Sequence, residues 1–379
     1  MIRLSIDTGN APDRTGIGVF ANGLLAALAN YAAGRITASK SDTSSTSRSW
    51  RPVHRLIYLA RLRKAYTRSY DGADLVHFTN TYVPKRHPRV CYASTVHDLD
   101  AILFPETYPA SYRMYIRKIV PMALRRADLI LTPSNAVRQA IIARFGVDAE
   151  TVRAVHHGLA PDFVRLVDTT AVEENSGIPT LLFVGMLWKK KNIAWLISRI
   201  AAGVRSNALP KLRLILAGSA GFRFDDIASE LRNASGVVSW IQSPSLPDLV
   251  KLYLQSSVVV LPSITEGYGL PLVEAMYCRK PIVASRIPSS VEVAEDAAWY
   301  FGLDDDDGFY HAVNEALADR DRARRLEGIH TRMRGFFWET LIPQFVGAYE
   351  HALERRTGKR VTVHSNDLKV APPMNEESA

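Results

Sequence analysis

Two glutamates lie in one short segment that is rich in glycine and proline. Residues 263–276 read SITEGYGLPLVEAM, in which seven residues separate Glu266 from Glu274. Gly267 and Gly269 leave room for a ligand beside the backbone and allow positive φ angles. A carboxylate early in a helix, as expected for Glu274, can accept hydrogen bonds from both hydroxyls of a ribose. The segment therefore predicts a site for a sugar and its phosphates, with Glu266 near the reacting end.

Three consecutive lysines follow a predicted strand and Gly185 in the segment FVGMLWKKKN, residues 183–192. Lys190 and Lys191 could hold a diphosphate and stabilise its charge as it leaves. The alternative is an exposed charged run that opens a helix at Asn192. The residues alone leave both interpretations open.

Two weaker signals lie in the first half of the chain. His97 ends a predicted strand, and a lone histidine there is either catalytic or structural. Gly16 and Gly18 precede a helix predicted to begin near Val19, where backbone N–H groups could approach a phosphate. A plain tight turn explains these glycines equally well. The missing spaced G-x-G-x-x-G fingerprint also argues against a dehydrogenase.

These side chains follow short apolar segments that predict parallel strands, and helical patterns such as residues 19–31 and 111–126 alternate with them. A chain of 379 residues is also longer than one core usually grows. The pattern predicts an α/β fold of two facing, doubly wound, Rossmann-like domains, joined by a polar linker within residues 161–178. The predicted strands are residues 3–7, 74–80, 89–98, 128–134 and 152–158, then 180–185, 212–218, 237–241, 257–262 and 281–285.

The net charge of +9 lies in the first part of the chain, where residues 1–170 hold 23 Lys and Arg against 13 Asp and Glu. Such a basic half favours an anionic partner: phosphate, nucleic acid or membrane lipid. The absence of a basic motif interleaved with aromatic residues argues against nucleic acid. Residues 51–70 contain no acid and predict a helix that either contacts anionic lipid or exposes its basic face to solvent.

The remaining sequence features are compatible with a cytosolic enzyme. No apolar run is long enough to span a membrane, and MIRLSIDTG lacks the pattern of a signal peptide. Cys91 and Cys278 share no metal-binding spacing and are expected to be unpaired. Residues 38–50 are low in complexity and predict a mobile loop, and residues 357–379 predict a disordered tail.

The order of Glu266 and Glu274 within their segment resembles the signature of the retaining glycosyltransferases of family 4, which have the GT-B fold. The lysine segment and residues 127–158 are also similar to segments of that family, and the resemblance covers about residues 1–350. It implies an acceptor domain at residues 1–170, a nucleotide-sugar domain at 178–336, and a helix at about 337–355 that returns to the first domain.

The resemblance also implies roles for individual residues. Lys190, Lys191, Glu266 and His97 would be catalytic: the lysines would grip the diphosphate, Glu266 would face the donor sugar, and His97 would touch the sugar that is transferred. No metal or other cofactor is expected, because the lysines replace a metal electrostatically. The donor-binding set would be Gly16, Gly18, Gly185, Gly267, Tyr268, Gly269, Leu270 and Glu274, with Glu274 on the ribose.

The segments His97-Asp98-Leu99 and Phe104-Pro105-Glu106 are similar to bacterial mannosyltransferases that build lipopolysaccharide O-antigen or exopolysaccharide. The resemblance therefore implies transfer of a hexose, first of all mannose from GDP-mannose and next a UDP-hexose, to a glycan acceptor. An acceptor linked to polyprenyl diphosphate would fit the basic first half and would place the protein in the cytoplasm, at the inner face of the cytoplasmic membrane.

Three positions depart from the family pattern. Lys190 stands where an arginine is usual, which replaces a bidentate phosphate contact by a point charge. Arg279 replaces a usual glycine, and Val291 replaces the usual proline before Glu292. An alternative function is that of a non-catalytic, glycosyltransferase-like subunit that binds glycan or nucleotide within an assembly complex.

Overall fold

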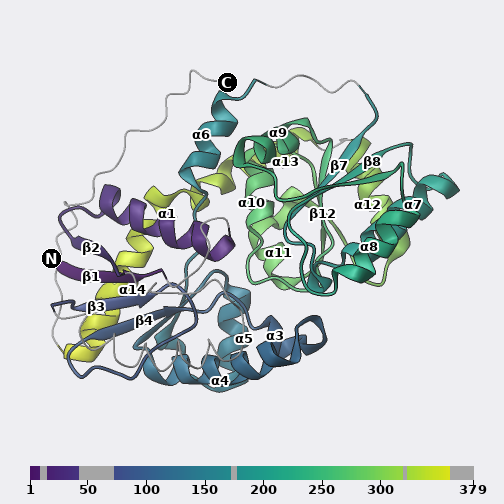
Figure 1. The fold of residues 1–379 in the computed structure, drawn as a ribbon. Coiled ribbons are helices and arrows are strands. Elements are labelled where there is room, and N and C mark those ends of the chain that lie inside the picture. The colour runs from purple at the N-terminus through teal and green to yellow at the C-terminus, as the bar shows by residue number, and fades with distance from the viewer. Residues whose placement is uncertain (9–14, 42–71, 172–176, 319–321, 359–379) are drawn as a thin grey trace.

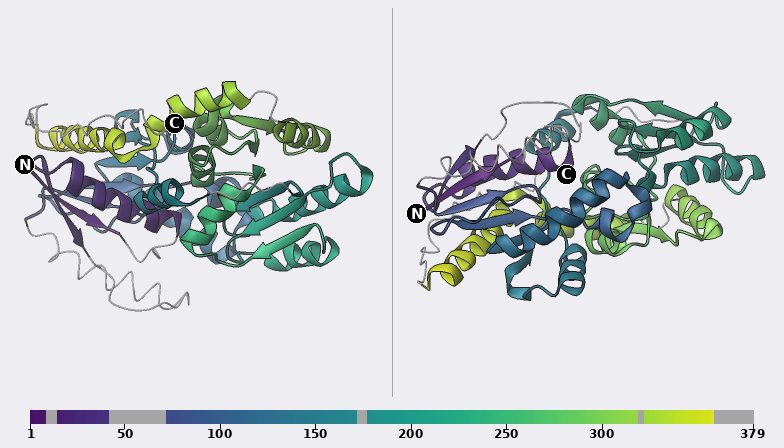
Figure 2. Two further views of the ribbon diagram at one scale, coloured as in Figure 1. Left: turned by 90° about the horizontal axis from the view of Figure 1, so that it is seen from above. Right: turned by 60° about the horizontal axis from the view of Figure 1, so that its bottom comes forward.

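The computed structural model describes residues 1–8, 15–41, 72–171, 177–318 and 322–358. They form two lobes that lie side by side, each built on a six-stranded parallel sheet covered by helices (Figures 1 and 2). The strand order is β2-β1-β3-β4-β5-β6 in the first sheet and β12-β11-β10-β7-β8-β9 in the second. The predicted α/β fold of two Rossmann-like domains is confirmed.

All ten predicted strands occur. Most are apolar segments that the sheet buries on both faces, whereas the edge strands at residues 152–154 and 238–241 are only partly buried. The first sheet contains β1 Ile2–Asp7, β2 Ile36–Ser41, β3 Leu75–Phe78, β4 Cys91–Thr95, β5 Leu129–Thr132 and β6 Val152–Ala154. The second contains β7 Thr180–Val184, β8 Arg213–Ala217, β9 Val238–Ile241, β10 Val258–Leu261, β11 Ile282–Ser285 and β12 Ala298–Phe301.

The prediction of a mobile loop at residues 38–50 is wrong at its start. Residues 36–41 form β2, which pairs in parallel with β1 from Ile2 opposite Ile36 to Asp7 opposite Ser41. An edge strand tolerates the polar sequence ITASKS because only one of its sides is paired. Residues 42–50 lie outside the described residues.

The helices of the first lobe are α1 Gly16–Tyr31, α3 Asp100–Leu103, α4 Ala110–Arg126 and α5 Asn135–Phe145. Helix α1 begins at Gly16 and not near Val19, because the Thr15 hydroxyl accepts a hydrogen bond from the Gly18 N–H at 3.2 Å and caps the helix. Ser134 caps α5 in the same way, through the Val137 N–H.

The second lobe carries the helices α7 Ile193–Ser206, α8 Phe224–Asn233, α9 Leu246–Gln255, α10 Leu270–Tyr277, α11 Pro288–Ala294, α12 Asp306–Ala318 and α13 Arg322–Met333. Helix α10 follows Gly269, whose φ of 98° is left-handed, and has Pro271 in its first turn as the sequence predicts. The predicted linker at 161–178 instead begins with helix α6 Pro161–Thr169. Its Phe163 packs into the core of the second lobe.

The last helix, α14 Trp338–Thr357, is part of the core of the first lobe, and Figure 1 shows it in yellow beside the first sheet. Its first residue fits between two glycines. A Cβ atom at Gly23 would lie 2.6 Å from the Trp338 indole, and one at Gly158 would lie 2.5 Å from it. Glycine at both positions therefore allows the chain to cross back from the second lobe at this point.

The other sequence predictions concern the two cysteines, membrane-spanning helices, the basic segment and the C-terminal tail. Cys91 and Cys278 are buried and unpaired. Every helix within the described ranges is too short or too polar to cross a lipid bilayer. The basic segment 51–70 lies outside the described residues. The prediction of a disordered tail at residues 357–379 is wrong at its start, because Thr357 ends helix α14 and Gly358 caps it, and the residues from 359 onward lie outside the described residues.

Candidate active site at the junction of the lobes

The loops that follow β4, β5 and β10 meet where the two lobes join. The Ser134 hydroxyl donates to the Gly267 carbonyl oxygen at 2.6 Å. A Cβ atom at Gly267 would lie 1.9 Å from the His97 carbonyl oxygen, so only glycine permits this approach. The carboxyl ends of both sheets, where open α/β sheets bind ligands, therefore face the same junction.

A cluster of charged side chains lies at this junction. The Lys190 Nζ of the second lobe is 2.7 Å from Asp100 Oδ2 and 3.4 Å from Asp98 Oδ2, both in the first lobe. The side chains of Lys190 and Lys191 are each only 14% exposed, so the interpretation as an exposed charged run is wrong. We call the following set the ion cluster: Asp98, Asp100, Lys190, Lys191 and Glu266.

The ion pairs keep Lys190 charged although it is buried. Burial alone would lower the pKa of the ammonium group, but Asp98 and Asp100 raise it well above its usual value. Lys190 is therefore a cation that already has two anionic partners.

Asp100 was not among the residues singled out from the sequence. It is buried and accepts a hydrogen bond from the Thr265 hydroxyl at 2.8 Å, in addition to its pair with Lys190. Burial and the nearby Asp98 raise the pKa of this carboxyl group to about 6, against the opposing effects of Lys190 and Thr265. The sequence signal that could have found it was a second acid two residues after Asp98.

Glu266 pairs with the second lysine of the cluster. Its carboxylate accepts a hydrogen bond from the Ser263 hydroxyl at 2.6 Å and forms an ion pair with Lys191. Burial would raise the pKa of Glu266, but the attraction of Lys191 and Lys190 outweighs it and holds the pKa below its usual value. The lysine loop and this loop are also joined directly, because the Ile264 N–H donates to the Lys190 carbonyl oxygen at 2.9 Å.

Glu274 lies in helix α10 and has a different environment. The Tyr253 hydroxyl donates to its Oε2 at 2.7 Å. Burial raises the pKa of Glu274, and the bond from Tyr253 opposes this shift. A carboxylate has several acceptor positions, so one tyrosine bond leaves it able to accept others.

Gly16, one of the glycines predicted to bind the donor, lies close to this helix. A Cβ atom at Gly16 would be 3.7 Å from Leu270 Cδ1, so the starts of α1 and α10 adjoin each other across the junction. The N–H of Gly18 is used by the Thr15 cap, and that of Gly185 donates to the Ala217 carbonyl oxygen at 3.0 Å. Their binding roles remain predictions.

Tyr268 joins the lobes through its side chain. Its ring is buried and its hydroxyl donates to the His157 carbonyl oxygen at 2.9 Å. A second contact between the lobes lies nearby, where the Glu292 carboxylate accepts from the Asn135 N–H at 2.6 Å and the Ala136 N–H at 2.8 Å. A carboxylate at the start of α5 is well placed to compensate its unpaired N–H groups.

His97 is half-buried and adjoins the buried rings of Phe20 and His157 in the first lobe. Its Nε2 lies 2.7 Å from the Thr79 carbonyl oxygen, which can only accept, so Nε2 carries the hydrogen. The Phe20 ring lies 4.0 Å from the His157 ring in a stacked arrangement and 5.6 Å from the His97 ring. We call His77, His97 and His157 the imidazole cluster.

The imidazole cluster is uncharged at neutral pH. Burial, together with His97, lowers the pKa of His77 to about 3, and burial lowers the pKa of His97 and His157 too. His77 is held on both sides, by Thr95 Oγ1 at 2.8 Å and by the Tyr349 hydroxyl of α14 at 2.8 Å. The three rings are therefore neutral; those of His77 and His97 are hydrogen-bonded, whereas the buried Nε2 of His157 has no hydrogen-bond partner among the described residues.

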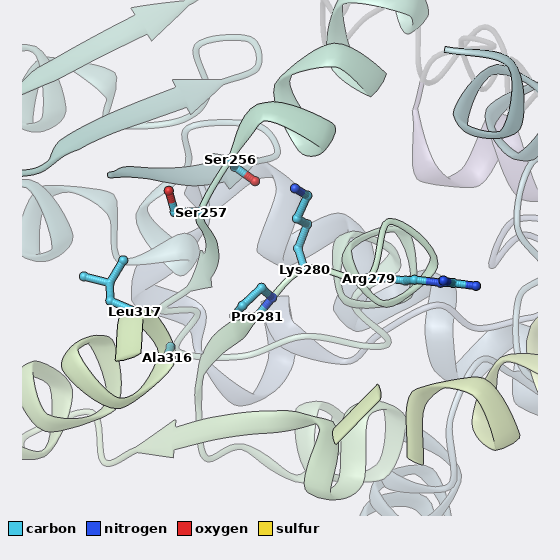
Figure 3. A pocket seen from close by; sticks show the side chains of 7 residues that line it. All are labelled: Ser256, Ser257, Arg279, Lys280, Pro281, Ala316 and Leu317. Carbon is cyan, nitrogen blue, oxygen red and sulfur yellow. The ribbon is translucent and has the colours of Figure 1, made fainter. Parts of the chain in front are cut away.

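A pocket of about 240 Å³ lies elsewhere, at the opposite end of the second sheet (Figure 3). Ser256 and Ser257 line it just before β10, and Lys280 and Pro281 line it just before β11. It therefore opens at the amino ends of these strands, and it contains none of the predicted site residues. The Lys280 ammonium donates to the Leu254 carbonyl oxygen at 2.6 Å.

The described residues contain no group of three or more His, Cys, Asp and Glu side chains with the geometry of a metal site. The expectation that no metal is needed remains a prediction.

The chain resembles known proteins along most of its length. The family model described as Glycosyltransferase Family 4 matches residues 23–163, and the one described as Glycosyl transferases group 1 matches residues 168–329. The chain is 28% identical over 291 residues to the O-antigen chain mannosyltransferase B of Escherichia coli, a match that covers 74% of this chain and 75% of that protein. With the O-antigen chain mannosyltransferase RfbU of Salmonella typhimurium it shares 28% identity over 286 residues, with the same coverage of both chains.

A solved structure shows the same fold. Anabaena HepE in complex with UDP-glucose superposes with a TM-score of 0.65 at 18% identity, over 92% of this chain and 99% of that one.

Proposed function

Since this chain belongs to the glycosyltransferases of family 4 and has the GT-B fold, we propose that it transfers a hexose from a nucleotide-sugar to a glycan acceptor with retention of the anomeric configuration. The observation that carries the proposal is the ion cluster. Two buried lysines lie where the carboxyl ends of both sheets meet, and an anionic leaving group at that point would be stabilised by both.

In this mechanism the lysines exchange partners. Without donor, Lys191 pairs with Glu266 and Lys190 with Asp100. The diphosphate of a nucleotide-sugar brings its own negative charge and competes for these ammonium groups. As the bond to the sugar breaks, charge grows on the diphosphate, so Lys191 stabilises the transition state more than the bound donor.

The other roles follow from position. Glu274, which lies beyond the first turn of α10, binds the ribose while Tyr253 holds its carboxylate in place. His97 donates to Thr79 through Nε2, which leaves Nδ1 as an acceptor for a hydroxyl of the transferred sugar. The acceptor hydroxyl attacks from the face that the leaving diphosphate occupies, which retains the configuration.

We further propose that mannose from GDP-mannose is the transferred group. The names of the two relatives above, both O-antigen chain mannosyltransferases, support this choice. The UDP-glucose in the Anabaena complex makes a UDP-hexose the second candidate. The acceptor is a glycan on polyprenyl diphosphate at the inner face of the membrane, in cell-surface polysaccharide synthesis. The excess of basic residues in positions 1–170 supports this acceptor.

A thermal-shift screen against GDP, UDP, ADP and their sugars tests the donor, because a ligand that binds the folded state raises the melting temperature. We expect GDP and GDP-mannose to give the largest shifts, and the Glu274→Ala variant to lose them. A larger shift with UDP than with GDP would indicate that the donor is a UDP-hexose and not GDP-mannose. Slow hydrolysis of the donor without acceptor would exclude the alternative of a non-catalytic subunit, whereas no turnover with any donor would favour it.

A further inference from the structure

A short segment of the first lobe, residues 100–107, lies against the second lobe, and we call it the α3 segment after the helix at its start. Figure 1 shows α3 between α4 and the second lobe. The start of the segment is held by Asp100, which pairs with Lys190 at 2.7 Å and accepts a hydrogen bond from the Thr265 hydroxyl at 2.8 Å. Both partners lie in the two loops of the second lobe where the diphosphate of the donor is proposed to bind.

The second lobe also holds the end of the segment. The Trp188 indole N–H, two positions before Lys190, donates to the Thr107 carbonyl oxygen at 2.8 Å. Between its two ends the chain forms the four residues of α3 and a 3-10 helix at Pro105–Thr107, and helices this short are unstable by themselves. Leu103, at the end of α3, is 45% exposed. Contacts with the second lobe therefore help to keep the α3 segment in place.

The contact at Asp100 occupies a cation that the donor would need. The Asp100 side chain is buried and is the nearest carboxylate to the Lys190 ammonium, with Asp98 farther away at 3.4 Å. A diphosphate that takes Lys190 would leave this buried carboxylate without its cation and next to a second anion. A buried carboxylate that loses its partner is strongly destabilised, and like charges a few ångströms apart repel each other. Movement of the α3 segment away from the lysines relieves both effects.

We propose that the α3 segment is an autoinhibitory switch, in which the Asp100 carboxylate occupies Lys190 in place of the diphosphate and donor binding releases the segment from the second lobe. Release at Asp100 also weakens the bond between Trp188 and Thr107, because both contacts hold the same short segment. The position of α3 then depends on whether the donor is bound. This inference rests on the proposed function, since it requires a diphosphate at Lys190, and it describes the regulation of that same site.

Amide hydrogen exchange, followed by mass spectrometry, tests the switch with and without the nucleotide that gives the larger thermal shift, GDP or UDP. We expect the nucleotide to slow exchange in the lysine loop at residues 185–192. In the α3 segment it should speed exchange at least about tenfold, because local opening becomes more frequent once the ion pair is lost. A ligand that binds without releasing the segment would slow its exchange or leave it unchanged.

Two variants separate loss of the ion pair from a general loosening between the lobes. Asp100→Asn keeps the bond from Thr265 but loses the charge, so the α3 segment should exchange fast already without nucleotide, and addition of nucleotide should change its rate less than about twofold. Glu292→Gln is the matched control, because Glu292 also joins the lobes, through the N–H groups of Asn135 and Ala136. This variant should exchange like the wild type in both states.

Several outcomes would overturn the switch. Slower or unchanged exchange in the α3 segment, while the nucleotide protects the lysine loop, would do so and leave the proposed function intact. Wild-type exchange in Asp100→Asn, or equally fast exchange in Glu292→Gln, would also contradict it. The comparison of the wild type with and without nucleotide decides the proposal even where a variant does not fold. A wild type that binds neither GDP nor UDP would instead refute the proposed function, and the donor's role in the switch with it.

Discussion

The imidazole cluster and the ion cluster lie near the same junction but solve the problem of burying polar groups in opposite ways. In the imidazole cluster, burial keeps the rings neutral, and His77 is satisfied by two hydroxyl groups. In the ion cluster, burial is offset by opposite charge, and Lys190 stays protonated between two aspartates. The neutral His97 ring suits the proposed recognition of a sugar hydroxyl, whereas paired charges can be exchanged for a diphosphate.

The largest effect should come from removing a charge that acts in the transition state. We expect Lys191→Ala to lower kcat by at least about 100-fold, because a preorganised electrostatic contact to the leaving group is lost. The neighbouring Lys189→Ala is the matched control and should stay within about twofold of the wild type. Steady-state kinetics with GDP-mannose measures both, and an unchanged kcat in Lys191→Ala would remove Lys191 from the mechanism.

Glu274→Ala should mainly raise the KM for the donor, by about 10-fold to 50-fold, since ribose contacts are similar in the ground and transition states. The Tyr253→Phe variant, which removes the hydroxyl that holds Glu274, should raise it only about threefold. A fall in kcat without a change in KM would show that Glu274 acts on the reacting centre.

A smaller effect is expected at Asp100, which competes with the donor for Lys190. Its pKa is raised to about 6, so the carboxyl group is ionised at pH 7.5 and becomes neutral as the pH falls through about 6. The donor KM of the wild type should therefore decrease as the pH falls through this value. Asp100→Asn should lower the KM about threefold at pH 7.5 and remove the pH dependence, while keeping the bond from Thr265. A pH profile of KM identical to that of the wild type would contradict this role.

The smallest effect concerns stability, where His77 of the imidazole cluster and Asp100 of the ion cluster respond to acid with opposite signs. The pKa of His77 is lowered, so the unfolded chain binds a proton between pH 6.5 and about 3 that the folded protein does not, and acid destabilises the fold. The raised pKa of Asp100 makes the folded protein the stronger proton binder between pH 6 and 3.8, which opposes this loss.

The His77→Gln variant isolates the imidazole contribution, because an amide can still bond both Thr95 and Tyr349. We expect its melting temperature to fall a few degrees less than that of the wild type between pH 7.5 and pH 5. Differential scanning calorimetry at the two pH values measures this. An equal decrease in both proteins would show that the buried ring does not govern acid sensitivity.

The sequence predicted those parts of the fold and site that follow from local pattern. Buried strands such as residues 258–261 are continuous apolar runs, and the loop after them carries Gly269 and Pro271, which fix the start of α10. The edge strand β2 was not predicted because its residues are mostly polar and exposed, so the sequence shows no continuous apolar run there.

What the sequence by itself determined is the set of local elements and the chemical types of the side chains at their ends: lysines after β7, glutamates around the start of α10, a histidine after β4. Only the tertiary structure decided which side chains become partners. It pairs Lys190 with Asp100, 90 positions away in the sequence, and places Thr265 and Trp188 against the first lobe. The physical reason is range. Periodicity and turn chemistry act within a few residues, whereas burial and ion pairing depend on which surfaces the folded chain brings together.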